Sequence, residues 1–171
     1  MASVAERIAE IRERIDAAAS RAGRPGSDVR LMAVSKLKSR EQIEEAYRAG
    51  QRLFGENRVQ EAQEKYADFY ADAELHLIGH LQSNKARDAV QLVSCIQSID
   101  KLKTAEAVEK RCGEHDTSLS VFLEVNTSGD ESKYGYRDRN RMFADLEQIL
   151  TFEHLRVSGL MTIGPLGGDE D

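Results

Sequence analysis

Short apolar segments alternate with longer amphipathic segments along most of this chain of 171 residues, and this alternation constrains the fold more than any other feature. The apolar segments have the length of strands, and the amphipathic segments carry apolar residues at helical spacing. We expect strands at residues 29–35, 52–56, 75–79, 93–99, 118–126 and 155–161. We expect helices from 39 to near 50, from 58 to 66, after 84, from 100 to 112 and from 139 to 150. Strand followed by helix, with short connections, predicts right-handed βαβ units and therefore a parallel sheet covered by helices.

Two α/β architectures contain such units, a doubly wound sheet and a (β/α)8 barrel. The chain has no GxGxxG after its first strand and no GxxxxGK[ST] segment, so the usual support for a nucleotide-binding doubly wound fold is missing. We therefore favour a TIM-type barrel. A compact barrel of eight units needs about 200 residues. Residues 1–171 are accordingly expected to be a single, C-terminally incomplete barrel domain of about six units, with "GPLGGDED" as an open loop.

An additional helix is expected before the first strand. Apolar residues recur at spacings of three and four from Val4 to Ala18, Ser3 and Glu6 match a capping box, and Gly23 ends the pattern. The apolar stripe lacks sustained heptads, so we expect this helix to pack on its own domain rather than to form a dimer seam, and we expect a monomer.

Charge and composition exclude several classes of protein. A net charge of −6 and a pI near 5.3 argue against a nucleic-acid partner. No apolar run is long enough to cross a membrane and no secretory signal is visible, so a cytoplasmic protein with no membrane association is expected. Cys95 and Cys112 stand alone and are expected to be free thiols.

Polar residues collect at the carboxyl ends of the expected strands, where barrels carry their chemistry. About half of such positions are explained by helix caps and solvated loops alone. The residues concerned are Ser35, Lys36, Glu56, Asn57, His80, Ser98, Asp100, Asn126, Ser128, Met161 and Thr162.

Lys36 stands out among them, because it closes an apolar run, Leu31 to Val34, that is typical of a buried strand. A lysine at a strand end commonly extends its ammonium group into water. At the mouth of a barrel, partial desolvation would instead lower its pKa and favour attack on a carbonyl. That chemistry is Schiff-base formation, with either a substrate carbonyl or pyridoxal phosphate. Lys38 is expected to be an ordinary solvated loop residue.

Other chemistries find less support. His76 and His80 would lie on one strand roughly 13 Å apart, too far to share a metal ion. His115 and His154 lack neighbours at ligand spacing, and no GxSxG or Cys–His arrangement offers a nucleophile. The basic segment "SKYGYRDRNR" is expected to be a solvated loop and helix start. We expect no metal site.

Six segments together resemble the signature blocks of the pyridoxal phosphate homeostasis protein family. They are "LMAVSKLKS", "FGENRVQEA", "HLIGHLQSNKAR", "QSIDKLK", "LEVNTSGDESKYG" and "VSGLMTIG", in family order from about residue 29 to 164. The resemblance implies a (β/α)8 barrel of the alanine-racemase type, the fold type III of pyridoxal phosphate proteins, without those enzymes' second domain. It also implies that Lys36 carries pyridoxal 5′-phosphate as a Schiff base, that Asn57 lies beside the cofactor ring and that Met161 helps to wall it.

The same resemblance implies a function in intracellular pyridoxal phosphate homeostasis. Members are thought to bind, buffer and deliver the cofactor, with effects on amino-acid and keto-acid balance, and apo forms of pyridoxal phosphate-dependent enzymes are the expected recipients. No catalytic residue is assigned, because no second acid/base group is evident in the sequence. A pyridoxal phosphate-dependent racemase or lyase and a cofactor-free Schiff-base aldolase are the alternatives. The family's serine- and glycine-rich phosphate cup and its arginine-containing strand have no counterpart here, so these 171 residues are expected to hold the cofactor weakly or not at all.

Overall fold

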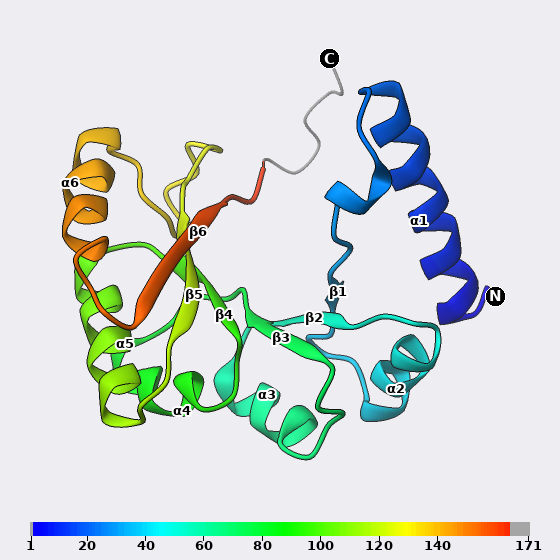
Figure 1. Ribbon diagram of the computed structural model, residues 1–171, viewed down its shortest axis with the longest axis horizontal. Coiled ribbons are helices and arrows are strands. Elements are labelled where there is room, and N and C mark those ends of the chain that lie inside the picture. Colours follow the sequence, from blue (N-terminus) through cyan, green and yellow to red (C-terminus); the bar gives the residue numbers. More distant parts are fainter. Residues whose placement is uncertain (1, 165–171) are drawn as a thin grey trace.

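The computed structural model describes residues 2–164, and these residues form one parallel sheet with helices along its outer side (Figure 1). The helices are α1 (Val4–Arg21), α2 (Arg40–Arg48), α3 (Val59–Tyr66), α4 (Ala86–Val90), α5 (Leu102–Glu114) and α6 (Arg139–Ile149). The strands are β1 (Ala33–Val34), β2 (Leu53–Glu56), β3 (Glu74–Leu77), β4 (Cys95–Ile99), β5 (Leu119–Glu124) and β6 (Leu155–Met161). Short 3₁₀ turns, η1 (Gly26–Asp28) and η2 (Ser83–Lys85), precede β1 and α4.

The order of the strands confirms the barrel-type architecture. All neighbouring strands pair in parallel, and their order in the sheet, β1 to β6, is the same as their order in the chain. A doubly wound sheet reverses its strand order at a switch point, and this sheet has no such reversal among residues 2–164. The sheet curves so that helices α2 to α6 follow one another along its convex side (Figure 1).

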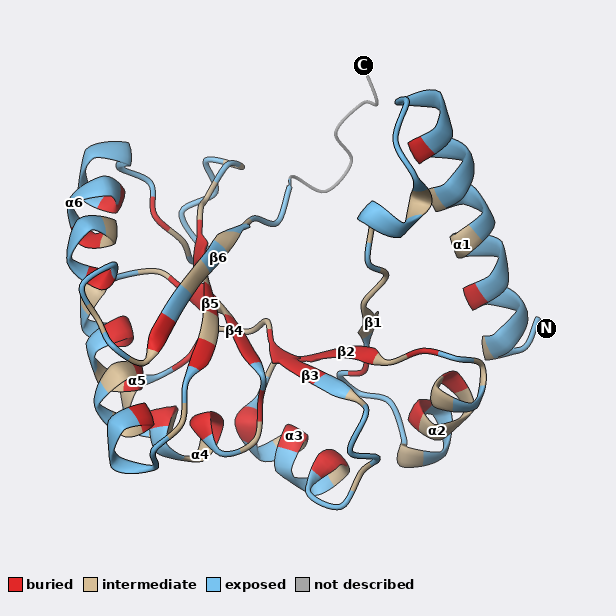
Figure 2. Ribbon diagram, in the orientation of Figure 1, coloured by how far each residue is buried: buried red, intermediate tan, exposed pale blue. Residues whose placement is uncertain are grey.

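The hydrophobic core fills the space between the strands and this outer layer of helices (Figure 2). Strands β2 to β5 are buried along most of their length, as expected for parallel strands covered on one face by helices. Phe54 in β2 and Ile96 in β4 are almost fully buried, and Val108 contributes the inner face of α5. Helices α2 to α6 are therefore held on the sheet by apolar side chains at helical spacing, as their sequence patterns predict. In α1 only Ile8 and Ala19 are buried, so most of its predicted apolar stripe is exposed or half-buried.

The first two helices begin as the sequence predicts. Ser3 and Glu6 form a complete capping box at α1, and Ser39 and Gln42 form another at α2. Helix α1 also packs on the domain as expected, because Arg12 donates hydrogen bonds to the carbonyl groups that follow α2, including that of Gly50 at 3.0 Å.

Two local expectations are wrong. The strand expected at 29–35 is reduced to β1, Ala33–Val34, and Val34 is 45% exposed instead of buried, because β1 pairs only with β2 within the described residues. Asp100 does not cap α5: the N-cap is Lys101, whose side chain makes no capping hydrogen bond. The capping carboxylate comes instead from Asp145 in α6, which accepts the backbone N–H of Leu102.

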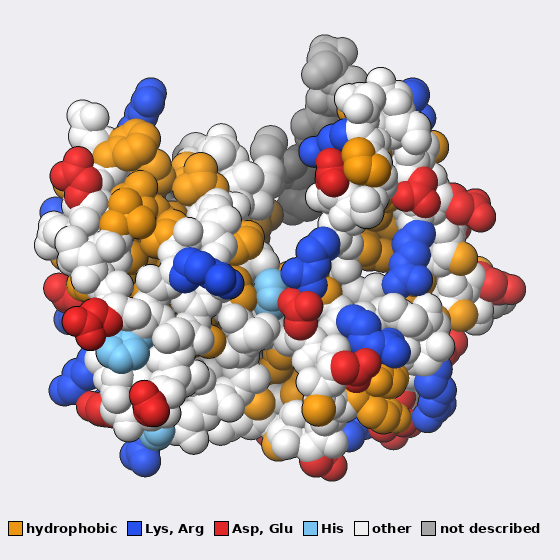
Figure 3. Space-filling view, in the orientation of Figure 1, with side chains coloured by type: hydrophobic (Ala, Val, Ile, Leu, Met, Phe, Trp, Pro, Cys, Tyr) orange, Lys and Arg blue, Asp and Glu red, His pale blue; other side chains and the backbone are white. Residues whose placement is uncertain are grey.

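Strand β6 has the bounds that the sequence predicts but a more exposed surface than the inner strands. It pairs with β5 alone among residues 2–164, and apolar side chains gather on the face over β6 and α6 (Figure 3). Leu160 of β6 is 62% exposed.

Most of the open loop expected at the end of the chain, residues 165–171, lies outside the described residues. Across residues 2–164, no helix combines the length and the apolarity that a bilayer crossing requires.

Candidate functional site

The candidate site lies at the carboxyl ends of the strands, where two of the predicted residues follow β1 and β2. Val34 pairs with Gly55, and the N–H of Ser35 still bonds the Gly55 carbonyl at 2.9 Å. Lys36 is the second residue after β1, and Asn57 is the first residue after β2. Both residues therefore lie at the same edge of the sheet, beyond the ends of two adjacent strands.

The surroundings of Lys36 differ from the expected ones. Its side chain is exposed, and its Nζ makes no hydrogen bond or ion pair with any residue of the described part of the chain. The expected partial burial of Lys36 is wrong, because β1 is an edge strand and no strand among residues 2–164 covers its outer side. An unpaired amine is nevertheless free to react with a ligand.

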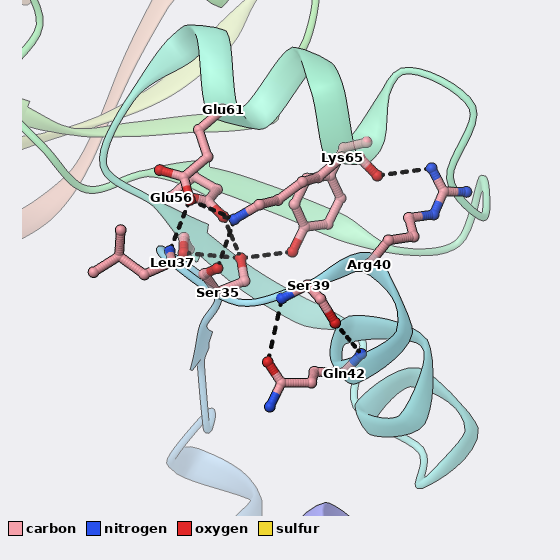
Figure 4. Close-up of polar contacts among 10 residues, drawn as sticks. Ser35, Leu37, Ser39, Arg40, Gln42, Glu56, Glu61 and Lys65 are labelled. Atoms are coloured by element: carbon pink, nitrogen blue, oxygen red, sulfur yellow. Dashed lines mark hydrogen bonds and ion pairs between the residues drawn. The ribbon is translucent and has the colours of Figure 1, made fainter.

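The backbone around Lys36 is firmly held (Figure 4). Residues 35–38 form a reverse turn, closed by a hydrogen bond of 3.0 Å from the N–H of Lys38 to the carbonyl of Ser35. The neighbouring helix α3 contacts this turn through Glu61 and Lys65. The exposed Lys36 side chain therefore extends from a hydrogen-bonded turn.

A cavity of about 250 Å³ opens beside Asn57, at the carboxyl ends of β2, β3 and β5. Its walls include Gly79, His80, Glu124 and Tyr134. Lys36 and Met161 are not among its lining residues. Gly79 allows a close approach at this point, because a Cβ at Gly79 would lie only 2.6 Å from the Asn57 Cα.

His80 and Tyr134 form one wall of this cavity. Their rings stack with centroids 3.8 Å apart and an angle of 10° between the planes. Asp100 lies beside His80, with 3.4 Å between Asp100 Oδ2 and His80 Nδ1. The interpretation of residues 132–141 as only a solvated loop and helix start is thus wrong at Tyr134, which packs against the site although it is 54% exposed.

Glu124 supplies a buried carboxyl group at the end of β5. Burial raises the pKa of Glu124 above its ordinary value, and the nearby charge of Asp100 adds to this effect. The cavity therefore combines a buried carboxyl group of raised pKa with the stacked imidazole and phenol rings of His80 and Tyr134.

Met161 lies at the same end of the sheet but on the other edge. It is the last residue of β6, and the four strands β2 to β5 lie between it and β1 in the sheet order. The curvature of the sheet turns the two edge strands toward the same side (Figure 1). No contact between Met161 and Lys36 or Asn57 is formed within residues 2–164.

Several other predicted polar residues support the structure of the strand ends. The hydroxyl of Ser35 donates to the buried Glu56 at 2.8 Å, and Ser98 donates to the Gly79 carbonyl at 2.7 Å. Asn126 donates to loop carbonyls, and Thr162 bonds the Val125 carbonyl at 2.8 Å. These hydrogen bonds account for the presence of polar side chains at the strand ends, and none of them requires a direct contact with a ligand.

One expectation for the histidines is wrong, because His80 lies after the end of β3 and not on the strand that carries His76. No group of three metal-ligating side chains occurs in the part of the chain that the structure describes. His76 lies in β3 and bonds Gln97 at 2.8 Å, and burial lowers its pKa. Both cysteines are buried free thiols. His154 does have a carboxylate partner, Glu109 of α5, which lies far from it in sequence.

Sequence reasoning missed three residues of the site. Glu61 and Lys65 stand four residues apart in α3, a spacing that favours a helical ion pair and could have drawn attention to the helix after Asn57. Tyr134 had no such signal, because its contact with His80 is made between two loops.

Comparisons with known proteins agree with this geometry. Residues 7–171 match the family described as alanine racemase, N-terminal domain. A pyridoxal phosphate homeostasis protein of Pseudomonas aeruginosa is 41% identical over 165 residues, which cover 95% of this chain and 71% of the relative. The chain belongs to the pyridoxal phosphate homeostasis protein family. Another relative with that name, from Pasteurella multocida, is 38% identical over 94% of this chain and 70% of its own length.

Solved structures of this homeostasis protein family show the same fold. PipY of Synechococcus elongatus without PLP superimposes with a TM-score of 0.86 and 41% identity, covering 98% of this chain and 74% of PipY. The PLP-bound PipY structure gives a TM-score of 0.76 and 42% identity, covering 92% of this chain and 72% of PipY. Alanine racemase of Clostridium difficile shares the fold alone, with a TM-score of 0.67 at 13% identity, covering 79% of this chain and 36% of the racemase.

Proposed function

We propose that this protein binds pyridoxal 5′-phosphate through Lys36 and acts in the homeostasis of that cofactor. The observation that carries the proposal is the 42% identity to PipY with PLP bound, combined with an unpaired Lys36 amine at the carboxyl end of β1. The cofactor's aldehyde condenses with a primary amine and releases water. Lys36 would supply that amine.

The chain's own residues fit such a ligand at two further points. The side-chain amide of Asn57 makes no hydrogen bond within residues 2–164, so its donor and acceptor groups are free for a ligand in the cavity that Asn57 lines. Met161 ends β6 at the same end of the sheet and would contribute an apolar wall. We propose Lys36 as the covalent anchor, Asn57 as a polar contact to the ring and Met161 as a ring neighbour.

The proposed role is buffering and delivery without turnover, in the cytoplasm, with apo enzymes as recipients. The names of the relatives support it. A racemase or lyase needs a second acid/base group that can reach the substrate carbon from the other side of the cofactor. The titratable side chains that line the cavity are His80, Glu124, Lys133 and Tyr134, and Lys36 does not line that cavity.

Lys36 is tested by adding pyridoxal phosphate to the purified protein and following visible absorbance. We expect a new absorbance band in the wild type, its loss in Lys36→Ala and its retention in Lys38→Ala. Lys38 is the matched control because it is an exposed lysine of the same turn. An unchanged band in Lys36→Ala would refute the assignment of the anchor.

Carrier and enzyme are separated by incubating the cofactor-loaded protein with single amino acids in deuterated water. The carrier proposal predicts no exchange of the α-proton beyond that caused by free cofactor. Exchange at enzymatic rates would support a racemase or lyase. Trapping by borohydride of a sugar phosphate or keto acid on the cofactor-free protein would support an aldolase instead.

A further inference from the structure

The turn that carries Lys36 contains an unfavourable backbone conformation. Leu37, at the third position of the turn, has a φ of 60°, in the left-handed region that glycine and asparagine adopt much more readily than leucine. Its side chain is 89% exposed, so packing of that side chain does not compensate for the conformation. Backbone contacts from outside the turn must therefore stabilise it.

Helix α3 provides these contacts on both sides of Lys36 (Figure 4). The N–H of Leu37 donates to Glu61 Oε1 at 2.7 Å. Lys65, one helical turn further along α3, donates from Nζ to the carbonyl of Ser35 at 2.9 Å. The residue before Lys36 and the residue after it are thus held by two side chains of the same helix.

The two side chains are also joined to each other. Lys65 Nζ lies 2.6 Å from Glu61 and 3.0 Å from Glu56, and the Lys65 side chain is only 13% exposed. Burial alone would lower the pKa of Lys65, but its hydrogen bonds to Glu61 and Glu56 outweigh burial and raise it. The hydrogen bond from Lys65 lowers the pKa of Glu61. Both groups are therefore charged at neutral pH, and Lys65 is not a second free amine.

Buried polar side chains lie next to the ion pair of Glu61 and Lys65. Glu56 is fully buried and accepts the hydroxyl of Ser35 at 2.8 Å, and the phenol of Tyr66 donates to the same Ser35 hydroxyl at 2.7 Å. Apolar side chains of α3 already anchor this helix to the sheet. The polar contacts are additional to that packing, and they converge on the two residues that flank Lys36.

We propose that Glu61 and Lys65 are positioning residues for Lys36. They hold Leu37 in its left-handed conformation, so that the backbone of the turn is fixed when the Lys36 amine reacts with the cofactor. The proposal rests on the proposed function of Lys36. It assigns a role to α3, whose side chains need not touch the cofactor. Loss of either contact should let the turn relax and slow the reaction of Lys36 without abolishing it.

The first measurement needs no cofactor. Hydrogen exchange of the Leu37 amide is followed in the cofactor-free protein, in the wild type and in Glu61→Ala. We expect protection in the wild type and its loss in the variant. Rapid exchange of this amide in the wild type would overturn the proposal, whatever the protein binds.

The second measurement is the rate at which the visible band develops after mixing with pyridoxal phosphate. Glu61→Ala and Lys65→Met should each slow it about tenfold or more, as expected when a reacting group is misplaced. Arg48→Met is the matched control, because it breaks an exposed i,i+4 ion pair with Glu44 on α2 that does not contact the turn. A wild-type rate in Glu61→Ala would overturn the proposal.

The decisive variant is Leu37→Asn in the Glu61→Ala background. Asparagine accepts the left-handed conformation more readily, so it should restore most of the lost rate if Glu61 acts through the turn. A slow rate in the double variant would overturn the proposal, because Glu61 would then act by another route. If the wild type develops no band at all, the function proposed for Lys36 fails, and the amide exchange alone decides whether the contact of Glu61 with the turn exists in solution.

Discussion

The carboxylate of Asp145 in α6 lies 2.9 Å from the backbone nitrogen of Leu102, the first residue of α5. The same carboxylate accepts the phenol of Tyr136 at 2.9 Å and pairs with Arg141 at 2.9 Å, although the Asp145 side chain is only 1% exposed. One side chain therefore caps a neighbouring helix and ties the loop before α6 to the same point.

Asp145→Ala should lower the free energy of unfolding by about 3 kcal/mol, because it leaves a helix end and a buried phenol without their partner. Urea unfolding followed by circular dichroism measures this loss. Asp138→Ala removes the exposed N-cap of α6 itself and should cost only about 1 kcal/mol. Equal losses in the two variants would contradict the central role of Asp145.

The comparison of Asp145 with Asp100 shows what a sequence can and cannot predict here. Strand and helix alternation follows from local periodicity, and the capping boxes of α1 and α2 involve residues three apart, so all of these were predictable. The cap of α5 comes from a residue 43 positions away, and no local pattern specifies such a contact.

The features of the candidate site likewise divide into those that the sequence predicts and those that it does not. The positions of Lys36 and Asn57 just after two adjacent strands were predictable, because parallel strands bring their carboxyl ends to one edge of the sheet. The exposure of Lys36 was not predictable, because it depends on which strands cover β1. The contacts of α3 with the turn were not predictable either, since a φ of 60° at Leu37 has no signature in the sequence.

Both cysteines should be unreactive in the folded protein. Burial raises the pKa of Cys95 to about 12 and that of Cys112 to about 11, so very little thiolate is present at neutral pH. With Ellman's reagent at about pH 8, we expect no fast reaction of the native protein and reaction of both thiols in denaturant. Fast labelling of either thiol in the native protein would show that its strand or helix opens readily.

The ion pair between His154 and Glu109 should make stability depend on pH. The hydrogen bond between the His154 ring and the accepting carboxylate of Glu109, 2.8 Å long, raises the pKa of His154 above its ordinary value. Because the folded pKa is the higher one, the contribution is complete below the unfolded pKa, about 6.5. It is lost as the pH rises through the folded pKa.

Glu109→Gln should therefore lower the His154 pKa, measured by NMR titration of the imidazole signals. The variant should also lose more stability at about pH 5.5 than at about pH 8.5. Glu153→Gln is the control, because Glu153 is adjacent to His154 but affects its pKa only through a weaker charge interaction. An equal effect of both variants would mean that general charge, and not the hydrogen bond, sets this pKa.

Gly79 should tolerate no side chain, because its backbone passes directly beside Asn57. A Cβ at this position would lie 2.6 Å from the Asn57 Cα and closer still to its carbonyl oxygen, and a backbone cannot yield as a flexible side chain can. Gly79→Ala should therefore lower the free energy of unfolding by about 2 kcal/mol and displace the backbone of Asn57.

Gly159→Ala is the matched control for this prediction, since a Cβ there would meet Phe122 at an ordinary 3.9 Å. Urea unfolding should separate the two variants in stability. Titration with pyridoxal phosphate should separate them in affinity, with weaker binding in Gly79→Ala alone if Asn57 contacts the cofactor. A Gly79→Ala protein that is destabilised but binds with wild-type affinity would remove Asn57 from the site and leave Lys36 as its only supported residue.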